Sequence, residues 1–263
     1  MNGRAHFAVT ILAFGYAFLY LPIALVMLYS FNDSRLVTVW AGFSLKWWRA
    51  LVENEAMLDA AWLSLRIGLV SATLATLLGL AAGYALARVP RFAGRTLFAG
   101  LVVAPMVMPE VVMGISMLLL FVGSDWLFGG PERGFLTITA AHVTFSLAFV
   151  AIVVQARLAD FDRSLEEAAM DLGATPWTTF LTVTLPLIAP ALASGWLLAF
   201  TLSLDDLILT QFVSGAQSQT LPMRVYSSVR LGVDPQINVL ATIVVAIAAG
   251  ALILSGWLTR RGN

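Results

Sequence analysis

Residues 164–186 read SLEEAAMDLGATPWTTFLTVTLP, a polar stretch that lies between two long apolar segments. Asp162 or Ser164 is placed to cap a short helix, and two glutamates follow in its first turn, where negative charge suits the helix dipole. Gly173 stands where a left-handed C-cap is expected. The pattern predicts the first arm of a helical hairpin that projects into water.

The second arm of this hairpin is predicted to begin at Thr175, an N-cap, with Pro176 at the first helical position. Leu185 and Pro186 mark where we expect the chain to turn into the next apolar segment. A capped polar hairpin in an otherwise apolar protein is suited to docking on a partner in water.

The rest of the chain is strongly apolar. Of its 263 residues, 60% are hydrophobic and 11% are charged, whereas soluble domains carry about 25% charged residues. Such a chain cannot cover its surface with polar groups, so lipid must be most of its solvent. Net charge is zero and cysteine is absent, which argues against a nucleic-acid surface and excludes disulfides, thiolate metal sites and a cysteine nucleophile. We expect no cleavable signal peptide, because the first apolar run is too long.

Six apolar segments are long enough to cross a membrane, which takes about 20 residues. Their hydrophobicity is continuous and does not alternate, so they predict helices and not barrel strands. The six predicted spans are 7–30, 61–87, 96–122, 137–158, 187–212 and 236–258. The predicted fold class is an all-α membrane protein, divided into residues 1–60 (the first span and an outer amphipathic segment) and a core of residues 61–258 with a loop at 159–186.

The distribution of basic residues gives the orientation. With the N-terminus inside, the 15 Lys and Arg divide eight inside to seven outside, which decides little. The short turn RVPRFAGR at 88–95 carries three arginines, however, and the pair Arg260 and Arg261 would lie on the same side. We therefore expect both termini and the 159–186 loop to be cytoplasmic.

Two predicted spans carry features beyond hydrophobicity. Gly79 and Gly83 form a G-x-x-x-G pair, which lets another helix approach closely. Pro105 and Pro109 each lack a backbone N–H and bend or break a helix, so their span should line protein or a cavity.

The outer segment at 43–65, FSLKWWRALVENEAMLDAAWLSL, predicts one amphipathic helix that lies along the membrane interface. Ser44 is its candidate N-cap, and Trp47, Trp48 and Leu51 share one side with Leu58. An aromatic anchor at the interface is the favoured interpretation over a partner site.

Three carboxylates lie within the predicted spans: Glu110, Asp205 and Asp206. A charge at the bilayer centre costs about 2.5–3.5 kcal/mol on insertion scales, so such residues are functional candidates, and an acidic cluster would attract a small organic cation. Asp205 and Asp206 are adjacent, about 100° apart on a helix, and cannot point the same way. The alternatives are a neutral Glu110 that satisfies backbone freed by the prolines, and aspartates that are merely solvated near the outer interface.

Packing is the favoured interpretation of the remaining polar and aromatic candidates. We expect His142 to hydrogen-bond between helices and not to bind a ligand. Tyr226 and Trp196 are candidate cavity aromatics. With two histidines and no cysteine, the sequence predicts no metal site and no catalytic site, and it contains no G-x-x-x-x-G-K-[ST] nucleotide loop.

The hairpin resembles the EAA loop of permease subunits of bacterial ABC importers. The resemblance rests on one spaced pattern: Glu167-Ala168-Ala169, then Gly173 after a gap of three residues, Val183 after a gap of nine, and Leu185-Pro186 after a gap of one. The family usually has Ile where this chain has Val183. Within that family the chain is most similar to permeases of putrescine importers. The stretches that carry this similarity are SFNDSRLVTVWAGFS (30–44), APMVMPEVVMGISMLLLFV (104–122), FDRSLEEAAMDLGATP (161–176), SGWLLAFTLSLDDLILTQFVSG (194–215) and TLPMRVYSSVRLGVDPQIN (220–238).

The resemblance implies a type I ABC importer permease fold (MetI-like) in the bacterial inner membrane. It implies a heterodimer with a second permease subunit, two ATPase subunits that bind ATP and Mg, and a periplasmic binding protein, with no cofactor on this chain and putrescine or a related polyamine as substrate. The coupling residues would be Glu166, Glu167, Ala168, Ala169, Asp171, Gly173, Leu185 and Pro186. The substrate path would include Glu110, Asp205, Asp206 and Tyr226.

Three other functions compete with this one. An ABC permease for another small cationic solute would share every feature named so far. An intramembrane aspartyl protease is disfavoured, because Asp205 and Asp206 are neighbours on one predicted helix and no G-x-G-D stretch is present. A stand-alone secondary transporter is disfavoured because the chain is short, shows no evident inverted repeat and would have no use for a docking hairpin.

Overall fold

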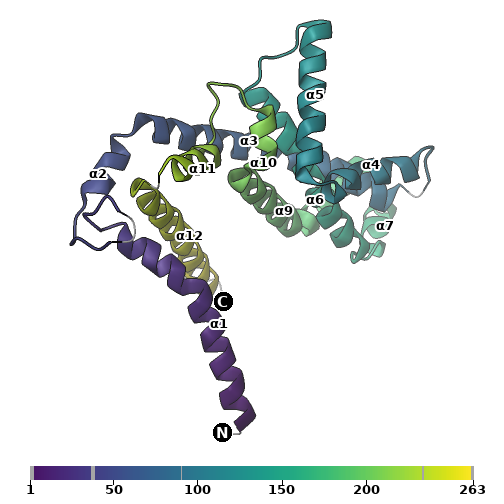
Figure 1. Ribbon diagram of the computed structural model, residues 1–263. Helices are drawn as coiled ribbons and strands as arrows, with labels where there is room; N and C mark the ends of the chain where they lie inside the picture. The colour runs from purple at the N-terminus through teal and green to yellow at the C-terminus, as the bar shows by residue number, and fades with distance from the viewer. Residues whose placement is uncertain (1–2, 37–38, 90, 233, 262–263) are drawn as a thin grey trace. The chain divides into compact units, whose positions relative to one another are not determined.

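The computed structural model describes residues 3–36, 39–89, 91–232 and 234–261. Every named element in these ranges is a helix (Figure 1), which confirms the predicted fold class. The elements are α1 (Gly3–Tyr29), α2 (Lys46–Val52), α3 (Glu55–Arg88), α4 (Arg95–Val107), α5 (Glu110–Phe128), α6 (Phe135–Ala159), α7 (Ser164–Asp171), α8 (Pro176–Thr179), the π-helical turn η1 (Phe180–Thr184), α9 (Leu185–Asp205), α10 (Ile208–Val213), α11 (Leu221–Leu231) and α12 (Gln236–Arg261).

Five helical stretches among the described residues are long and apolar enough to cross a membrane: His6–Tyr29, Glu55–Arg88, Glu110–Leu127, Phe135–Ala159 and Pro176–Asp205. Two shorter apolar helices are Arg95–Val107 and Gln236–Gly250. All six predicted spans therefore fall on apolar helices, but the third and the fifth are each divided.

The predicted span 96–122 is interrupted by one of its two prolines, as the sequence predicted. Its chain is divided into α4 and α5, and the break lies at Met108, whose backbone is extended (φ −73°, ψ 138°). Pro109 is the cause, because it lacks an N–H and its ring pushes the preceding residue out of the helical region. Pro105 is accommodated inside α4.

The outer segment 43–65 is also two helices and not one. α2 ends at Val52, and Asn54 starts α3 by accepting a hydrogen bond on its Oδ1 from the backbone N of Met57 at 3.1 Å. An asparagine that caps a new helix in this way competes with continuation of the old one. Ser44, the predicted N-cap, lies one residue before the observed N-cap Leu45, and its Oγ accepts a hydrogen bond from Lys46 N at 3.2 Å.

The chain forms two compact units, residues 1–59 with 225–263 and residues 60–224. In the first unit α12 packs against both α1 and α2 (Figure 1). Asn54 Nδ2 donates to Gln236 Oε1 at 2.9 Å, which ties the loop after α2 to the start of α12. The helices at the two ends of the chain therefore belong to one unit.

The core of the second unit lies where α3, α6 and α9 meet. A Cβ atom added at Gly79 would lie 2.7 Å from Val150 Cβ, and one added at Gly83 would lie 2.6 Å from the carbonyl oxygen of Ala151. The G-x-x-x-G pair thus allows the predicted close approach, and the partner helix is α6. The buried residues of this core are Ala72, Ala75, Val150, Val154, Leu158, Ile188 and Ala199.

Two further clusters extend this core along α6. One joins α3, α5, α6 and α10 through Ile67, Met113, Ile138, Ala141, Leu209 and Val213. The other joins α3, α4 and α6 through Ala82, Leu86, Val102 and Ala151. Because all three clusters include α6, this helix is the centre of the second unit.

Candidate functional site

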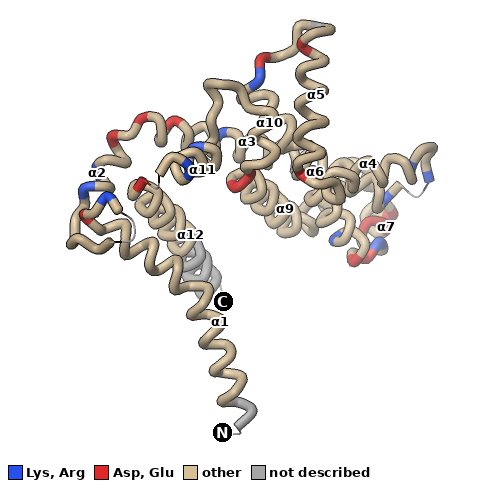
Figure 2. Tube along the Cα trace, viewed as in Figure 1, with Lys and Arg blue, Asp and Glu red and all other residues tan. Residues whose placement is uncertain are grey.

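Charged residues of both signs gather around α7, whereas residues 6–29 of α1 carry none (Figure 2). α7 begins where predicted. The Asp162 carboxylate accepts a hydrogen bond from the backbone N of Ser164 at 3.0 Å, and this bond holds the pKa of Asp162 below its usual range. The carboxylate is therefore ionised at neutral pH and caps the start of α7.

The end of α7 is a Schellman motif built on glycine. The backbone N of Gly173 donates to Met170 O at 2.9 Å, and Ala174 N donates to Ala169 O at 3.1 Å. Gly173 has φ = +90°, a left-handed conformation that L side chains rarely adopt. This confirms the predicted C-cap.

The second arm of the hairpin also starts as predicted but ends differently. Thr175 Oγ1 accepts from Thr178 N at 3.2 Å, with Pro176 in the first turn of α8. The predicted turn at Leu185-Pro186 is absent, since the backbone stays helical from α8 through η1 into α9. The missing N–H of Pro186 falls in the first turn of α9, directly after the widened π turn, where its loss is tolerated.

Glu166 and Glu167 point in different directions although both were predicted to serve one site. Glu166 is largely buried and forms an ion pair from its Oε2 to Arg88 Nε at 2.9 Å. Its Oε1 accepts a hydrogen bond from Thr184 Oγ1 at 2.6 Å. Glu167 is exposed. Ala168, Asp171, Leu172 and Gly173 in α7 and its C-terminal turn are exposed as well.

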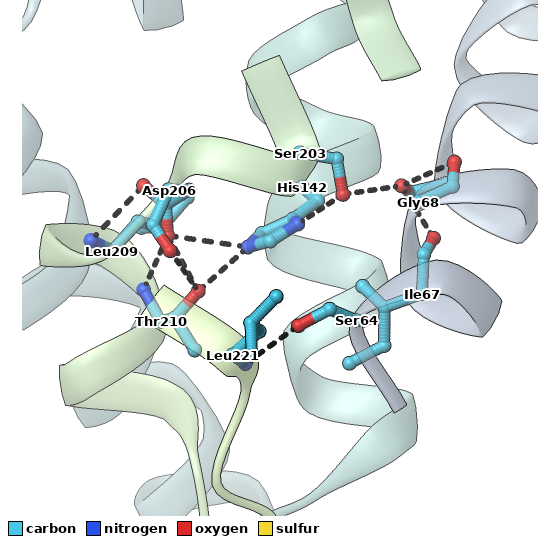
Figure 3. A network of polar contacts seen from close by, with 10 residues as sticks. Ser64, Ile67, Gly68, His142, Ser203, Asp206, Leu209, Thr210 and Leu221 are labelled. Carbon is cyan, nitrogen blue, oxygen red and sulfur yellow. Dashed lines mark hydrogen bonds and ion pairs between the residues drawn. The ribbon is translucent and has the colours of Figure 1, made fainter. Parts of the chain in front are cut away.

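A second group of polar residues surrounds a break between α9 and α10 (Figure 3). Asp206 is extended (φ −65°, ψ 123°), and its carboxylate accepts from Leu209 N at 3.3 Å and Thr210 N at 2.7 Å. Thr210 Oγ1 donates to the same carboxylate at 2.5 Å. The predicted continuous span 187–212 is wrong at this point, because Asp206 caps α10 and so ends α9.

His142 connects this break to the rest of the second unit. Its Nδ1 lies 2.6 Å from Ser203 Oγ, and its Nε2 lies 2.9 Å from Thr210 Oγ1 and 3.3 Å from Asp206 Oδ2 (Figure 3). Because the Thr210 hydroxyl gives its one proton to Asp206, it must accept from His142 Nε2. The predicted interhelical role of His142 is confirmed.

Ser71 extends this hydrogen-bond chain, because its Oγ lies within donating distance of Ser203 Oγ at 3.0 Å and of Ile67 O at 2.7 Å. Ser71, His142 and Ser203 are all buried, and they belong to α3, α6 and α9. Low dielectric strengthens such a network when every member has a partner. The sequence did not reveal Ser71, Ser203 or Thr210, since single hydroxyl residues in apolar helices carry no spacing signal.

The predicted path residues lie in different surroundings. Asp205, the last residue of α9, is exposed, whereas its neighbour Asp206 is held in the His142 network. Glu110 is exposed at the first position of α5, immediately after Pro109. Of the three carboxylates predicted to line the path, Asp205 and Glu110 therefore lie outside the His142 network.

Both candidate aromatic side chains, Tyr226 and Trp196, already contact other residues of this chain. Tyr226 belongs to the first unit, and the guanidinium carbon of Arg230 lies 4.7 Å from its ring centroid. Trp196 Nε1 donates to Thr73 Oγ1 at 3.1 Å, and its ring stacks on Phe200 at 5.2 Å. In the described part of the chain, His, Asp and Glu form no group of three or more that could hold a metal ion.

Comparison with known proteins places this geometry in a family. Residues 75–261 match the model of the binding-protein-dependent transport system inner membrane component, and the chain belongs to that family. It is a multi-pass inner-membrane transport component.

Two curated relatives are similar over nearly the whole chain. The putrescine transport system permease protein PotI of Escherichia coli (strain K12) is 52% identical over 255 residues, which cover 97% of this chain and 90% of the relative. The spermidine/putrescine transport system permease protein PotC of the same strain is 42% identical, covering 94% of this chain and 93% of the relative.

Solved structures show the same fold at low sequence identity. A bacterial ABC transporter that imports the polysaccharide alginate has a TM-score of 0.71 and 16% identity, with 98% of this chain and 95% of that chain covered. The methionine transporter MetNI has a TM-score of 0.59 and 18% identity, with 78% and 95% covered. The predicted MetI-like permease fold is thereby confirmed.

Proposed function

We propose that this chain is a permease subunit of an ATP-driven importer that moves putrescine or a closely related polyamine from the periplasm to the cytoplasm. The observation that carries the proposal is the 52% identity, over 97% of the chain, to a putrescine permease. Spermidine is the second candidate cargo, because relatives at 42% identity are named as spermidine/putrescine permeases.

The importer is proposed to contain a second permease subunit, two ATPase subunits and a periplasmic binding protein. A structural neighbour, the alginate transporter, is known in complex with a periplasmic protein, which supports this assembly. ATP and Mg would be held by the ATPase chains, so we propose that this chain carries no cofactor. Both termini and α7 would face the cytoplasm.

α7 is the proposed coupling helix. Glu167, Ala168, Ala169 and Asp171 would present polar and small side chains to a groove of the ATPase, and Gly173 would supply the turn that sets the angle of the hairpin. Closure of the two ATPase subunits would carry the hairpin with it. Because α8 and η1 continue directly into α9, which begins with Leu185 and Pro186, this movement would reach the membrane helices without a flexible joint.

The proposed substrate path uses the acidic residues. Asp205 and Glu110 are exposed carboxylates at helix ends, and they would attract the ammonium groups of a polyamine. Asp206 would act at the same place by a different means, because its capping of α10 determines where α9 ends and therefore where Asp205 lies. Tyr226 would offer an aromatic face to a cation, as it already does to Arg230.

Affinity purification tests the assembly, and competition tests the cargo. A tagged copy of this chain, expressed with the genes that neighbour its own, should co-purify with an ATPase and with a second permease. Uptake of labelled putrescine in the same cells should be reduced by unlabelled spermidine to the extent that both are cargo. Purification without any ATPase, or uptake that is insensitive to every polyamine, would contradict the proposal.

A further inference from the structure

Glu166 is surrounded by groups of its own chain. One carboxylate oxygen lies 2.9 Å from Arg88 Nε, and the other accepts from Thr184 Oγ1 at 2.6 Å. The Arg88 and Glu166 side chains are only 9% and 12% exposed. A carboxylate whose two oxygens are both occupied and largely buried has little left to offer a partner protein, although it lies next to the exposed Glu167.

Arg88 extends the contact to further helix ends. Its Nη1 donates to Leu158 O at 3.1 Å near the end of α6, and its guanidinium lies 5.4 Å from the centroid of the Phe161 ring. Arg163 Nη2 reinforces the junction by donating to Ala87 O at 3.0 Å. Cations suit the carbonyl ends of helices, so these arginines are held at the C-terminal ends of α3 and α6.

Thr184 brings the base of α9 into the same junction. It is the last residue of η1, and its side chain is buried. π-helical turns inside longer helices are uncommon and are often found at functional positions. The hydroxyl of the π turn and the carboxylate of α7 are thereby joined by one hydrogen bond at the point where α9 begins.

We propose that Arg88, Glu166 and Thr184 form a clamp that makes α7 move as one body with α3, α6 and α9. Glu166 is then a positioning residue, and of the two adjacent glutamates only Glu167 belongs to the ATPase-docking surface. The inference rests on the proposed function, in which α7 receives movement from an ATPase. It divides the adjacent glutamates between two tasks: docking at Glu167 and transmission of movement through Glu166.

The clamp predicts different defects for the two glutamates. Glu166→Gln leaves the docking surface intact, so the complex should still assemble and hydrolyse ATP, but import per ATP hydrolysed should fall on the order of tenfold because Arg88 is left buried without its counter-ion. The matched variant Glu167→Gln should instead weaken co-purification with the ATPase. Thr184→Val, which removes one hydroxyl at nearly constant volume, should lower the coupling ratio less than Glu166→Gln.

The measurement is the coupling ratio, putrescine imported per ATP hydrolysed, of the complete purified complex in proteoliposomes. A variant that only unfolds some of the protein lowers import and hydrolysis together and leaves this ratio unchanged. Adding Arg88→Gln to Glu166→Gln should lower the ratio little beyond the single variants, since residues in one ion pair are not additive.

A Glu166→Gln complex with the wild-type coupling ratio, or one that loses the ATPase as Glu167→Gln does, would overturn the clamp. The same holds if the effects of Arg88→Gln and Glu166→Gln are fully additive. A wild-type chain that never associates with an ATPase would overturn the proposed function and the clamp together, so the two failures are distinguishable.

Discussion

At the scale of single residues, adjacent acids in this protein have opposite surroundings. Glu166 faces inward and Glu167 outward, and Asp206 is held by His142 while Asp205 is exposed. Nothing in the sequence distinguishes the two members of either pair. The difference arises because one member finds a buried partner on another helix, and a buried charge is tolerated only when it is paired.

The first prediction concerns Asp206. Asp206→Asn replaces one acceptor oxygen by an NH₂ group, so the carboxylate can no longer accept from Thr210 N, Thr210 Oγ1 and Leu209 N together. Loss of a helix cap lowers the free energy of unfolding by about 0.5–2 kcal/mol, and we expect Asp206→Asn to lower it by at least that much. The measurement is a thermal melt of the purified protein in detergent.

Asp205→Asn is the matched control, because it makes the same chemical change one residue away at an exposed position. It should leave the melting temperature unchanged. Equal destabilisation by both variants would contradict the capping role of Asp206.

At the scale of helices and turns, local chemistry was predictable and long-range partners were not. The caps at Asp162, Gly173 and Thr175 follow from residues a few positions apart, so the sequence indicated them correctly. The break at Asp206 has no proline or glycine to announce it. It depends on a carboxylate that satisfies the backbone of α10, which the apolar pattern of the span conceals.

The clamp and the hydrogen-bond partners of His142 were missed for a related reason. Arg88 and Glu166, like His142 and Ser203, come from helices that are distant in sequence, and no residue spacing specifies which helix end will meet which. The Gly79 and Gly83 pair indicated close packing correctly, but it could not name α6 as the partner.

The second prediction tests the turn at Gly173. Gly173→Val should abolish uptake while the protein still inserts in the membrane, because a left-handed conformation costs an ordinary residue about 1–2 kcal/mol and the end of α7 would be redirected. Uptake is measured against the amount of the chain found in membranes by immunoblot.

Gly94→Val is a control of equal backbone strain. Gly94 has φ = +82° and, like Gly173, open space around the position of an added Cβ, but it precedes α4 and lies outside the hairpin. Uptake should therefore be retained. Loss of uptake in both variants would mean that strain alone, and not the orientation of α7, explains the effect.

At the scale of the whole molecule, the apolar composition and the helical fold fit a chain whose solvent is lipid. The second unit contains the proposed coupling helix α7, the proposed clamp and the break at Asp206, and α6 contributes to each of its three buried clusters. Movement applied at α7 would thus reach the break at Asp206 through packed helices.

The third prediction concerns orientation and uses the absence of cysteine from the chain. Single cysteines placed at Leu172 and Leu231, which are 90% and 91% exposed, would be the only thiols available. In intact cells with a permeable outer membrane, an impermeant maleimide should label Leu231→Cys, whereas Leu172→Cys should react only after the inner membrane is opened. The reverse pattern would place α7 outside and contradict its docking on an ATPase.

The central claim, that this chain carries a polyamine past exposed carboxylates, is tested most directly by uptake of radiolabelled putrescine in cells that express the complete importer with wild-type chain, Glu110→Gln or Asp205→Asn. We predict uptake by the wild type and a raised KM in both variants, at unchanged amounts of assembled complex, because each removes a negative charge from the proposed path. Unchanged KM in both variants would contradict the acidic path, and absence of putrescine uptake by the wild type would contradict the assignment of the cargo.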